Sequence, residues 1–197
     1  SIDETVEVIK KYEQWITYWE SKKDKGQAHA VNKGWSRSTG EIIGWLNSDD
    51  IHLPGTIERA VLELVRNPNA GFVTGICEFV DWKTGDLVGT VKGGPLDMKK
   101  LLKECYIAQP AIFMRKSALE KAGFLNENLH YALDYELWIR MAQVADMVYH
   151  PVLQARAYET GKNKTRLPRW EINYYGEFRS VLWKLLDNHN FSEEYKK

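Results

Sequence analysis

Hydrophobic positions recur with helical spacing in several parts of the chain. Ala28, Val31 and Trp35 fall on one face of a segment from 26 to 38, which predicts an amphipathic helix. Gly40 follows it and is a natural helix stop. Further helices are predicted over 5–12, 54–66, 97–102, 117–122, 135–144 and 167–186.

Short apolar runs predict the strands. The run 41–46, Glu-Ile-Ile-Gly-Trp-Leu, is almost continuously apolar, which is typical of a strand buried on both faces of a parallel or mixed sheet. A turn at 83–86 joins two extended segments into a hairpin. Further extended segments are predicted over 16–20, 71–81, 87–91, 107–115 and 147–158, the last one interrupted near Pro151.

The order of these elements predicts the fold class. Strands alternate with helices in the first half, and a hairpin follows in the second. This order favours an α/β protein with a layered sheet of mixed strand direction. The 197 residues, of which 44% are hydrophobic, suit one compact domain with a real core.

Charge and cysteine content narrow the function classes. Lys plus Arg and Asp plus Glu both count 27, so the net charge is zero, which argues against a nucleic-acid binder. The two cysteines, Cys77 and Cys105, form no disulfide framework, so we expect a reducing, cytoplasmic location. No apolar run approaches the roughly 20 residues of a membrane-spanning helix, and no signal peptide is visible.

Two adjacent acids, Asp49 and Asp50, follow the apolar run 41–46. In open α/β sheets, ligands bind beyond the carboxyl ends of the strands. Neighbouring carboxylates repel each other there, and a Mg²⁺ or Mn²⁺ ion that also binds substrate phosphates would neutralise them. The alternative is a solvated loop in which one of the two acids caps the helix that starts near Pro54.

The segment 25–56 resembles the donor-binding core of family 2 glycosyltransferases. That core has a Gly-x-x-x-Ala-x-Asn-x-Gly helix, a Thr-Gly-Glu turn, a buried strand and an acid cluster followed by Pro. The matching residues are Gly26, Ala30, Asn32, Gly34, Thr39, Gly40, Glu41, Asp49, Asp50 and Pro54.

Two downstream segments resemble the same family. Residues 134–140, which begin Asp134-Tyr135-Glu136, resemble its catalytic helix start, and Gln109-Pro110-Ala111 resembles the strand beside its acceptor site. Three positions depart from the pattern. Asn47 replaces the first Asp of the acid motif, Leu133 replaces a Glu, and the segment 160–163 lacks a His that many members have.

The resemblance implies a GT-A fold over residues 1–165, with a carboxyl-terminal helical extension over 166–197. It also implies that the sheet is truncated at its amino terminus, since the family has a strand–helix–strand unit before the segment that Ser1 begins. An edge left open in this way would favour pairing with a second copy.

The resemblance further implies an inverting transfer of sugar from a nucleotide-diphosphate sugar to a hydroxyl of a cell-surface glycan or a lipid-linked acceptor. Asp134 would be the general base, and Asp49 and Asp50 would hold Mn²⁺ or Mg²⁺. Gly26, Gln27 and Asn32 would contact the donor together with the acid pair. Gln109 would line the acceptor side. For Asp134 the alternative is a simple helix cap, and for Gln27, Asn32 and Gln109 ordinary structural or surface positions.

Other functions stay open. The chain could be a non-catalytic GT-A-like domain that binds a partner or glycan, or a nucleotidyltransferase, which also uses a sheet and acidic metal ligands. A basic patch near the carboxyl end is by default a solvated surface. The less favoured interpretation is contact with a diphosphate or with anionic lipids at the inner face of the plasma membrane. The patch comprises Lys162, Lys164, Arg166 and Arg169.

Overall fold

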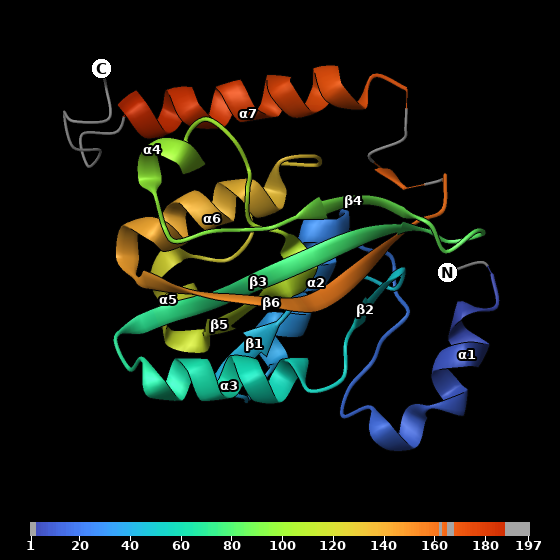
Figure 1. Ribbon diagram of the computed structural model, residues 1–197. Coiled ribbons are helices and arrows are strands. Elements are labelled where there is room, and N and C mark those ends of the chain that lie inside the picture. Colours follow the sequence, from blue (N-terminus) through green and yellow to red (C-terminus); the bar gives the residue numbers. More distant parts are fainter. Residues whose placement is uncertain (1–2, 162, 165–167, 188–197) are drawn as a thin grey trace.

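The computed structural model describes residues 3–161, 163–164 and 168–187. A six-stranded mixed sheet has the order β1-β5-β3-β6-β2, with β4 paired to β3 (Figure 1). β3 and β6 are parallel, and the other pairs are antiparallel. The strands are β1 (Ile42–Gly44), β2 (Asp50–His52), β3 (Ala70–Asp81), β4 (Leu87–Val91), β5 (Ile112–Arg115) and β6 (Asp146–Glu159).

The helices follow the predicted pattern closely. They are α1 (Thr5–Lys11), α2 (Gln27–Arg37), α3 (Thr56–Arg66), α4 (Met98–Leu101), α5 (Lys116–Ala122), α6 (Leu133–Val144) and α7 (Trp170–Asp187), with single 3₁₀ turns at η1 (Glu13–Trp15) and η2 (Gln109–Ala111). The predicted start of the last helix at 167 lies outside the described residues.

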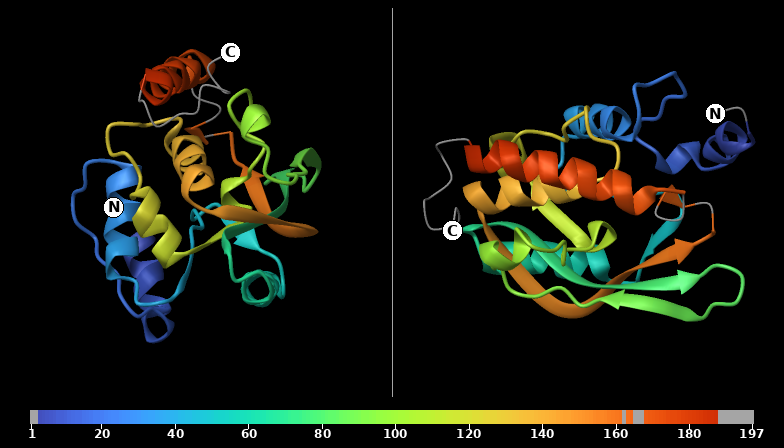
Figure 2. Two further views of the ribbon diagram at one scale, coloured as in Figure 1. Left: turned by 90° about the vertical axis from the view of Figure 1, so that its left-hand side faces the viewer. Right: turned by 90° about the horizontal axis from the view of Figure 1, so that it is seen from above.

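Helices cover both faces of the sheet, as the predicted GT-A sandwich requires (Figure 2). Neighbouring residues on one strand serve opposite faces. Phe72 of β3 packs in the large cluster with α2, α5 and α6, whereas Val73 packs against Ala60 and Leu64 of α3. The core therefore lies on both sides of the central strands.

The prediction of a doubly buried strand at 41–46 was wrong. β1 has three residues, lies at the edge of the sheet and pairs with β5 alone on the sheet path. Trp45 leaves the strand and packs edge-on against Trp35, with ring centroids 5.9 Å apart. Its carbonyl and indole N–H bond to side chains of the site. The apolar run therefore serves helix packing and the site as well as the sheet.

Two more extended segments were predicted incorrectly. Residues 16–20 form no strand, and the predicted strand 107–115 is a 3₁₀ turn, η2, followed by β5. The short strand β2, which begins at Asp50, was not expected. It pairs with β6, so Asp50 lies in the sheet, and Asp49 lies in the turn immediately before it.

The predicted interruption near Pro151 is a bulge within one long strand. Thr74 pairs with Tyr149 and Ile76 with Leu153, so three residues of β6 stand opposite Gly75. A side chain at Gly75 would collide with Gln154, whose Cδ lies 2.6 Å from the ideal Cβ position. Glycine therefore permits the close approach at the bulge.

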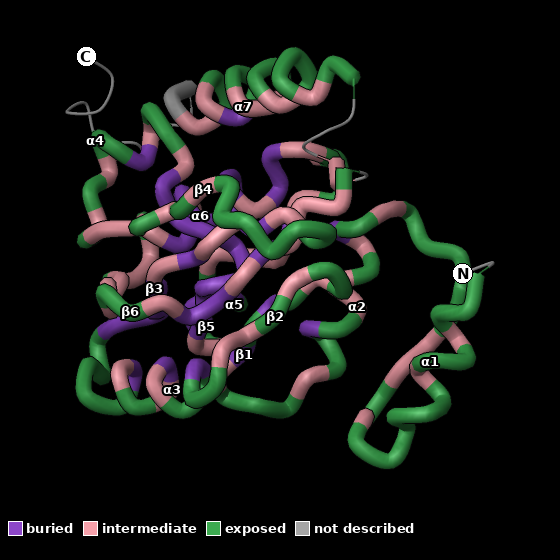
Figure 3. Tube along the Cα trace, turned by 45° about the vertical axis from the view of Figure 1, so that its right-hand side comes forward, coloured by how far each residue is buried: buried purple, intermediate pink, exposed green. Residues whose placement is uncertain are grey.

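The two ends of the described chain differ in packing. α1 has no buried residue and extends away from the sheet (Figure 3). α7 packs on the large core cluster through Tyr174, Phe178 and Leu182. The division at residue 165 stays a prediction, although α7 is joined closely to the rest. Among the helices of the described chain, none is long and apolar enough to cross a membrane.

Candidate functional site

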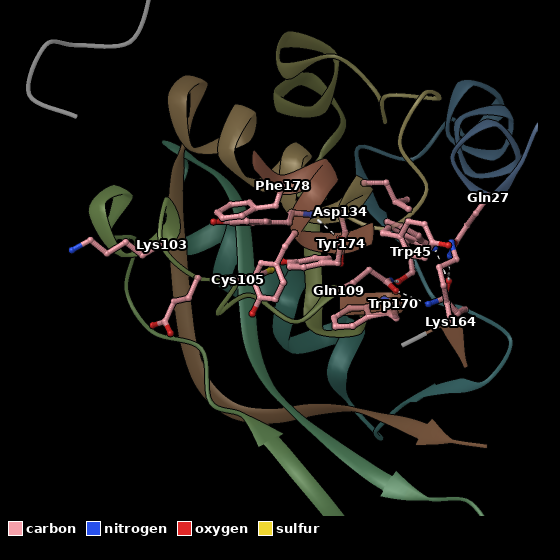
Figure 4. Close-up of a pocket in the computed structure, with 16 residues that line it drawn as sticks. Gln27, Trp45, Lys103, Cys105, Gln109, Asp134, Lys164, Trp170, Tyr174 and Phe178 are labelled. Atoms are coloured by element: carbon pink, nitrogen blue, oxygen red, sulfur yellow. Dashed lines mark hydrogen bonds between the residues drawn. The ribbon is translucent and has the colours of Figure 1, made fainter. Parts of the chain in front are cut away.

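Two adjoining cavities open where α2, η2, α6 and the segment after β6 meet. The acid cavity has a volume of about 510 Å³ and contains Asp49 and Asp50 in its wall. The aromatic cavity has a volume of about 410 Å³ and is lined by α7 (Figure 4). Both cavities share Gln27, Asn47, Cys105, Gln109, Asp134 and Lys164.

The acid pair is held between β2 and the segment after β6. Asp49 accepts a hydrogen bond from the Asn163 amide at 2.9 Å, and its carbonyl accepts the Tyr158 N–H. Asp50 starts β2 opposite Ala157. Burial and the neighbouring charge of Asp49 raise the pKa of Asp50 to about 6. The two carboxylates thus repel each other and favour a cation or a proton.

Asn47 joins the acid pair to the rest of the site. Its Oδ1 accepts hydrogen bonds from Trp45 Nε1 at 3.0 Å and Gln27 Nε2 at 3.2 Å. Its Nδ2 donates to Asp50 Oδ2 at 3.1 Å and to Gln109 Oε1 at 2.7 Å. The amide is therefore fully bonded. The sequence marked Asn47 as a departure from the family pattern but gave no sign of this role.

Asp134 lies in the first turn of α6 and lines both cavities. It is not a helix cap, because the cap position belongs to Ala132. Its Oδ1 accepts the N–H of Tyr135 at 2.8 Å. Burial raises the pKa of Asp134, while this hydrogen bond and the charge of Lys164 lower it. The dipole of α6 favours the ionised form of Asp134, but burial is the largest effect on its pKa and opposes ionisation.

Glu136 faces away from Asp134, as its position on the helix predicts. It is buried and pairs with Arg140 at 2.6 Å. The same guanidinium donates to the carbonyls of Ala122, Gly123 and Phe124. This clamp holds α6 against the segment after α5, so Glu136 has a structural role.

Lys164 brings a positive charge to the junction of the two cavities. Its Nζ donates to Gln27 Oε1 at 2.8 Å and to the His130 carbonyl at 2.6 Å. Burial lowers the pKa of Lys164, and the charges of Glu177 and Asp134 raise it. The sequence placed Lys164 in a basic patch with a solvated surface as the default; the structure places it in the site instead.

Glu177 of α7 holds the loop that precedes Asp134. Its carboxylate accepts the backbone N–H groups of His130, Tyr131 and Ala132 at 2.8, 2.7 and 2.9 Å. Nothing in the sequence singled out this residue, because its partners lie more than forty positions earlier. α7 is therefore bonded directly to the amino-terminal end of α6.

The predicted donor contacts on α2 divide into two groups. Gln27 lines both cavities, and Gly26 precedes it as the cap residue with φ of 119°. Asn32 lies outside the lining of both cavities and bonds to the backbone of Leu125 at 2.9 and 3.0 Å. These contacts favour a structural role for Asn32, and we do not retain Asn32 as a donor contact.

The acid pair fits a hard divalent cation that is completed by a ligand. Within the described residues, no three His, Cys, Asp or Glu side chains cluster as a metal site. Two carboxylates in the wall of one cavity are nonetheless the usual protein share of an Mg²⁺ site, in which water and phosphate oxygens supply the remaining ligands. Burial first, and the charge of Asp49 second, raise the pKa of Asp50, and a bound cation would counteract both effects.

A comparison with known protein families identifies the family of this chain. The sequence profile of Glycosyl transferase family 2 matches residues 1–123. The chain belongs to this family. The family 2 match covers α2, the acid pair and Gln109, and it ends before Asp134.

The relatives of this family 2 chain agree with the assignment. An uncharacterized glycosyltransferase of Rickettsia typhi is 26% identical over 186 residues, covering 87% of this chain and 56% of that protein. An Escherichia coli UDP-Glc:alpha-D-GlcNAc-diphosphoundecaprenol beta-1,3-glucosyltransferase is 28% identical over 116 residues, covering 58% of this chain and 44% of that protein. The chain thus spans about half the length of such relatives.

Solved structures confirm the GT-A fold. S. aureus TarS 1-349 in complex with UDP-GlcNAc matches with a TM-score of 0.73 at 15% identity, covering 100% of this chain and 58% of that one. The mannosyltransferase PcManGT from Pyrobaculum calidifontis, in complex with GDP-Man and Mn²⁺, matches with a TM-score of 0.61 at 17% identity, covering 93% and 56%.

Proposed function

We propose that the chain transfers a sugar from a nucleotide-diphosphate sugar to a hydroxyl of a glycan or lipid-linked acceptor, with inversion at the anomeric carbon. One observation carries the proposal: Asp49, Asp50 and Asp134, from distant parts of the sequence, line one cavity. The relatives add support, since they include proteins in complex with UDP-GlcNAc or GDP-Man and a glucosyltransferase with a lipid-linked acceptor in its name.

The general base is assigned to Asp134. In its ionised form it takes the proton of the acceptor hydroxyl. The hydroxyl oxygen then forms a bond to the anomeric carbon, and the bond from that carbon to the phosphate oxygen breaks. The electron pair leaves with the nucleoside diphosphate, so charge passes from the base to the leaving group.

The leaving diphosphate gains negative charge in this step. Asp49 and Asp50 are assigned as the residues that hold Mn²⁺ or Mg²⁺, which when bound supplies positive charge to the phosphate oxygens. Lys164 adds a second positive group from the wall shared by both cavities. Gln27 bonds to Lys164 Nζ and to Asn47, and so positions the Lys164 ammonium group relative to the acid pair.

The test is the substitution Asp134→Asn. The amide keeps the shape but cannot accept the proton, so we expect transfer to fall about 10²–10⁴-fold. Binding of UDP or GDP with Mn²⁺, followed by calorimetry, should stay within about twofold, a change well under 1.4 kcal/mol. Asp146→Asn, on an exposed position outside both cavities, is the matched control.

Different failures point to different functions. Turnover retained in Asp134→Asn would remove this residue from the mechanism. A chain that binds a glycan but neither nucleotide nor Mn²⁺ would support the non-catalytic alternative.

A further inference from the structure

α7 presents a row of aromatic rings to the aromatic cavity. Trp170, Tyr174 and Phe178 are four residues apart and share one helix face. The Trp170 and Tyr174 rings lie 4.9 Å apart at 18°, and the Tyr174 and Phe178 rings lie 6.4 Å apart at 10°. We call these three residues the aromatic ladder; Figure 4 labels all of them around the cavity.

Core packing accounts for only part of this ladder. The next turn of α7 contains Val181, which is only 6% exposed, so the helix has its own core contact there. The three ladder rings are only partly buried, and all of them line the cavity. The rings stack on one another, and Phe178 also stacks on Tyr135 of α6 with ring centroids 4.9 Å apart. The ring surface left to the open space of about 410 Å³ is therefore that of Trp170, which ends the row, together with the ring edges. The space is within the size range of small-ligand sites.

The charges around the cavity suit a neutral, hydroxyl-rich ligand. Lys103 and Glu104 contribute one charge of each sign, and Lys164 and Asp134 do the same. Balanced charge gives both donors and acceptors without a net attraction for an anion. An aromatic face attracts the weakly positive C–H groups of a pyranose ring, because the face of the ring is electron-rich.

The position of Asp134 indicates which cavity serves the donor and which serves the acceptor. It lies in the wall of both cavities, and the acid pair lines only the acid cavity. If the diphosphate binds at the acid pair, the acceptor must reach Asp134 from the other side.

We propose that the aromatic cavity is the acceptor subsite, and that it binds a pyranose ring of a glycan stacked on Trp170, whose ring is held in place by Tyr174 of the aromatic ladder. The ring presents a hydroxyl to Asp134, and Gln109 lies in the same wall. This inference rests on the proposed function. It names the acceptor as a sugar, which neither the family nor the fold specifies.

The experiment measures binding to an array of immobilised mono- and disaccharides. Trp170→Ala and Tyr174→Ala should each weaken the strongest glycan signal about tenfold, whereas Tyr174→Phe keeps the ring and should stay near the wild type. Trp183→Ala is the matched control, because Trp183 lies on the same helix, is 70% exposed and lines neither cavity. Circular dichroism checks that each variant is folded.

Two results would overturn the subsite directly. One is a wild type that binds no glycan on the array. The other is binding to phosphatidylglycerol vesicles that Trp170→Ala and Trp183→Ala reduce equally, since the aromatic residues would then serve a membrane.

Calorimetry with UDP or GDP and Mn²⁺ on the same variants separates this inference from the proposed function. Nucleotide binding and transfer with an unchanged acceptor KM in both alanine variants would overturn the subsite and leave the transferase intact. Ladder-dependent glycan binding without nucleotide binding in the wild type would instead overturn the transferase, and the acceptor role with it.

Discussion

Asn47 limits the negative charge of the site, because a neutral amide stands beside the acid pair. An amide has two donors and two acceptor positions, and Asn47 uses all of them. A carboxylate at this position would lose both donors and place a third negative charge beside Asp50. The departure from the family pattern therefore lowers the repulsion within the acid motif.

Asp50 makes stability depend on pH and metal. Its pKa in the folded chain is about 6, above the ordinary 3.8, so its contribution to stability is complete below about pH 4 and is lost as the pH rises through 6. We expect the wild-type melting temperature to fall between pH 4 and 7 relative to Asp50→Asn. Mn²⁺ at pH 7 should recover it in the wild type alone.

Differential scanning fluorimetry with and without Mn²⁺ measures both effects. Asp86→Asn, an exposed acid in the hairpin turn, serves as the control for general loss of charge. Equal stabilisation of the wild type and Asp50→Asn by Mn²⁺ would show that the ion binds elsewhere.

Lys164 is one of the groups that favour the ionised form of the base. Its charge lowers the pKa of Asp134, which burial raises. Activity requires ionised Asp134, so the rate is lost as the pH falls through its pKa. Lys164→Met should shift the acidic limb of the kcat/KM profile to higher pH.

The pH–rate profile of the variant is compared with that of Lys83→Met, which removes an exposed cation from the hairpin turn. A limb that stays in place in Lys164→Met would mean that Lys164 does not act on the base.

At the scale of elements, α7 is hydrogen-bonded through Glu177 to the loop that leads into the site. Glu177 accepts three backbone N–H groups from residues 130–132, immediately before the helix that carries Asp134. Hydrogen bonds of this kind, with a charged acceptor, are strong, and N–H groups left without partners are costly. The loop geometry, and with it the position of Asp134, therefore depends on α7.

Glu177→Gln should loosen this loop. We expect a loss of about 2 kcal/mol in stability, a lower kcat and a nearly unchanged donor KM, because none of residues 130–132 lines the acid cavity. Hydrogen exchange at the amides of 130–132 should speed up at least about tenfold, since a loss of 1.4 kcal/mol in local protection has that effect. Glu171→Gln, an exposed acid in the first turn of α7, is the control.

A structural role alone predicts a different pattern. It would lower the melting temperature of Glu177→Gln without changing kcat at temperatures where the variant is folded. Unchanged exchange at residues 130–132 would contradict the loop contact itself.

The elements also show what local sequence can predict. Helical periodicity placed α2 and α3 to within a few residues, because each buries one apolar face. It also placed α6, although residues 135–139 are all buried and the helix is covered on most sides. The prediction for 41–46 was wrong because an apolar run does not reveal which neighbouring elements will cover its side chains. Ile43 lies in β1, which pairs with β5, whereas Trp45 packs against Trp35 of α2. β2 has three residues, too few to give a periodic signal.

At the scale of the whole molecule, the acid pair, Asp134 and Gln109 could be predicted because the family motifs retain their order. Their meeting in one cavity depends on the sheet, which brings β2 beside the end of β6. Asn163 and Glu177 could not be predicted as site residues, and Lys164 entered only through the less favoured diphosphate interpretation of the basic patch. Their partners lie far away in sequence, and a lone polar residue in a loop or helix has no pattern of its own.

The boundary of the family match passes between the two halves of the site. Residues 1–123 include the acid pair, while α6, Lys164 and the aromatic ladder follow later in the chain. On the proposed function, the acid pair serves the donor, and the wall built by the last third of the chain receives the acceptor. Substitutions in that last third would thus change the recipient molecule without touching the residues assigned to the leaving group, as long as Asp134 stays in the shared wall.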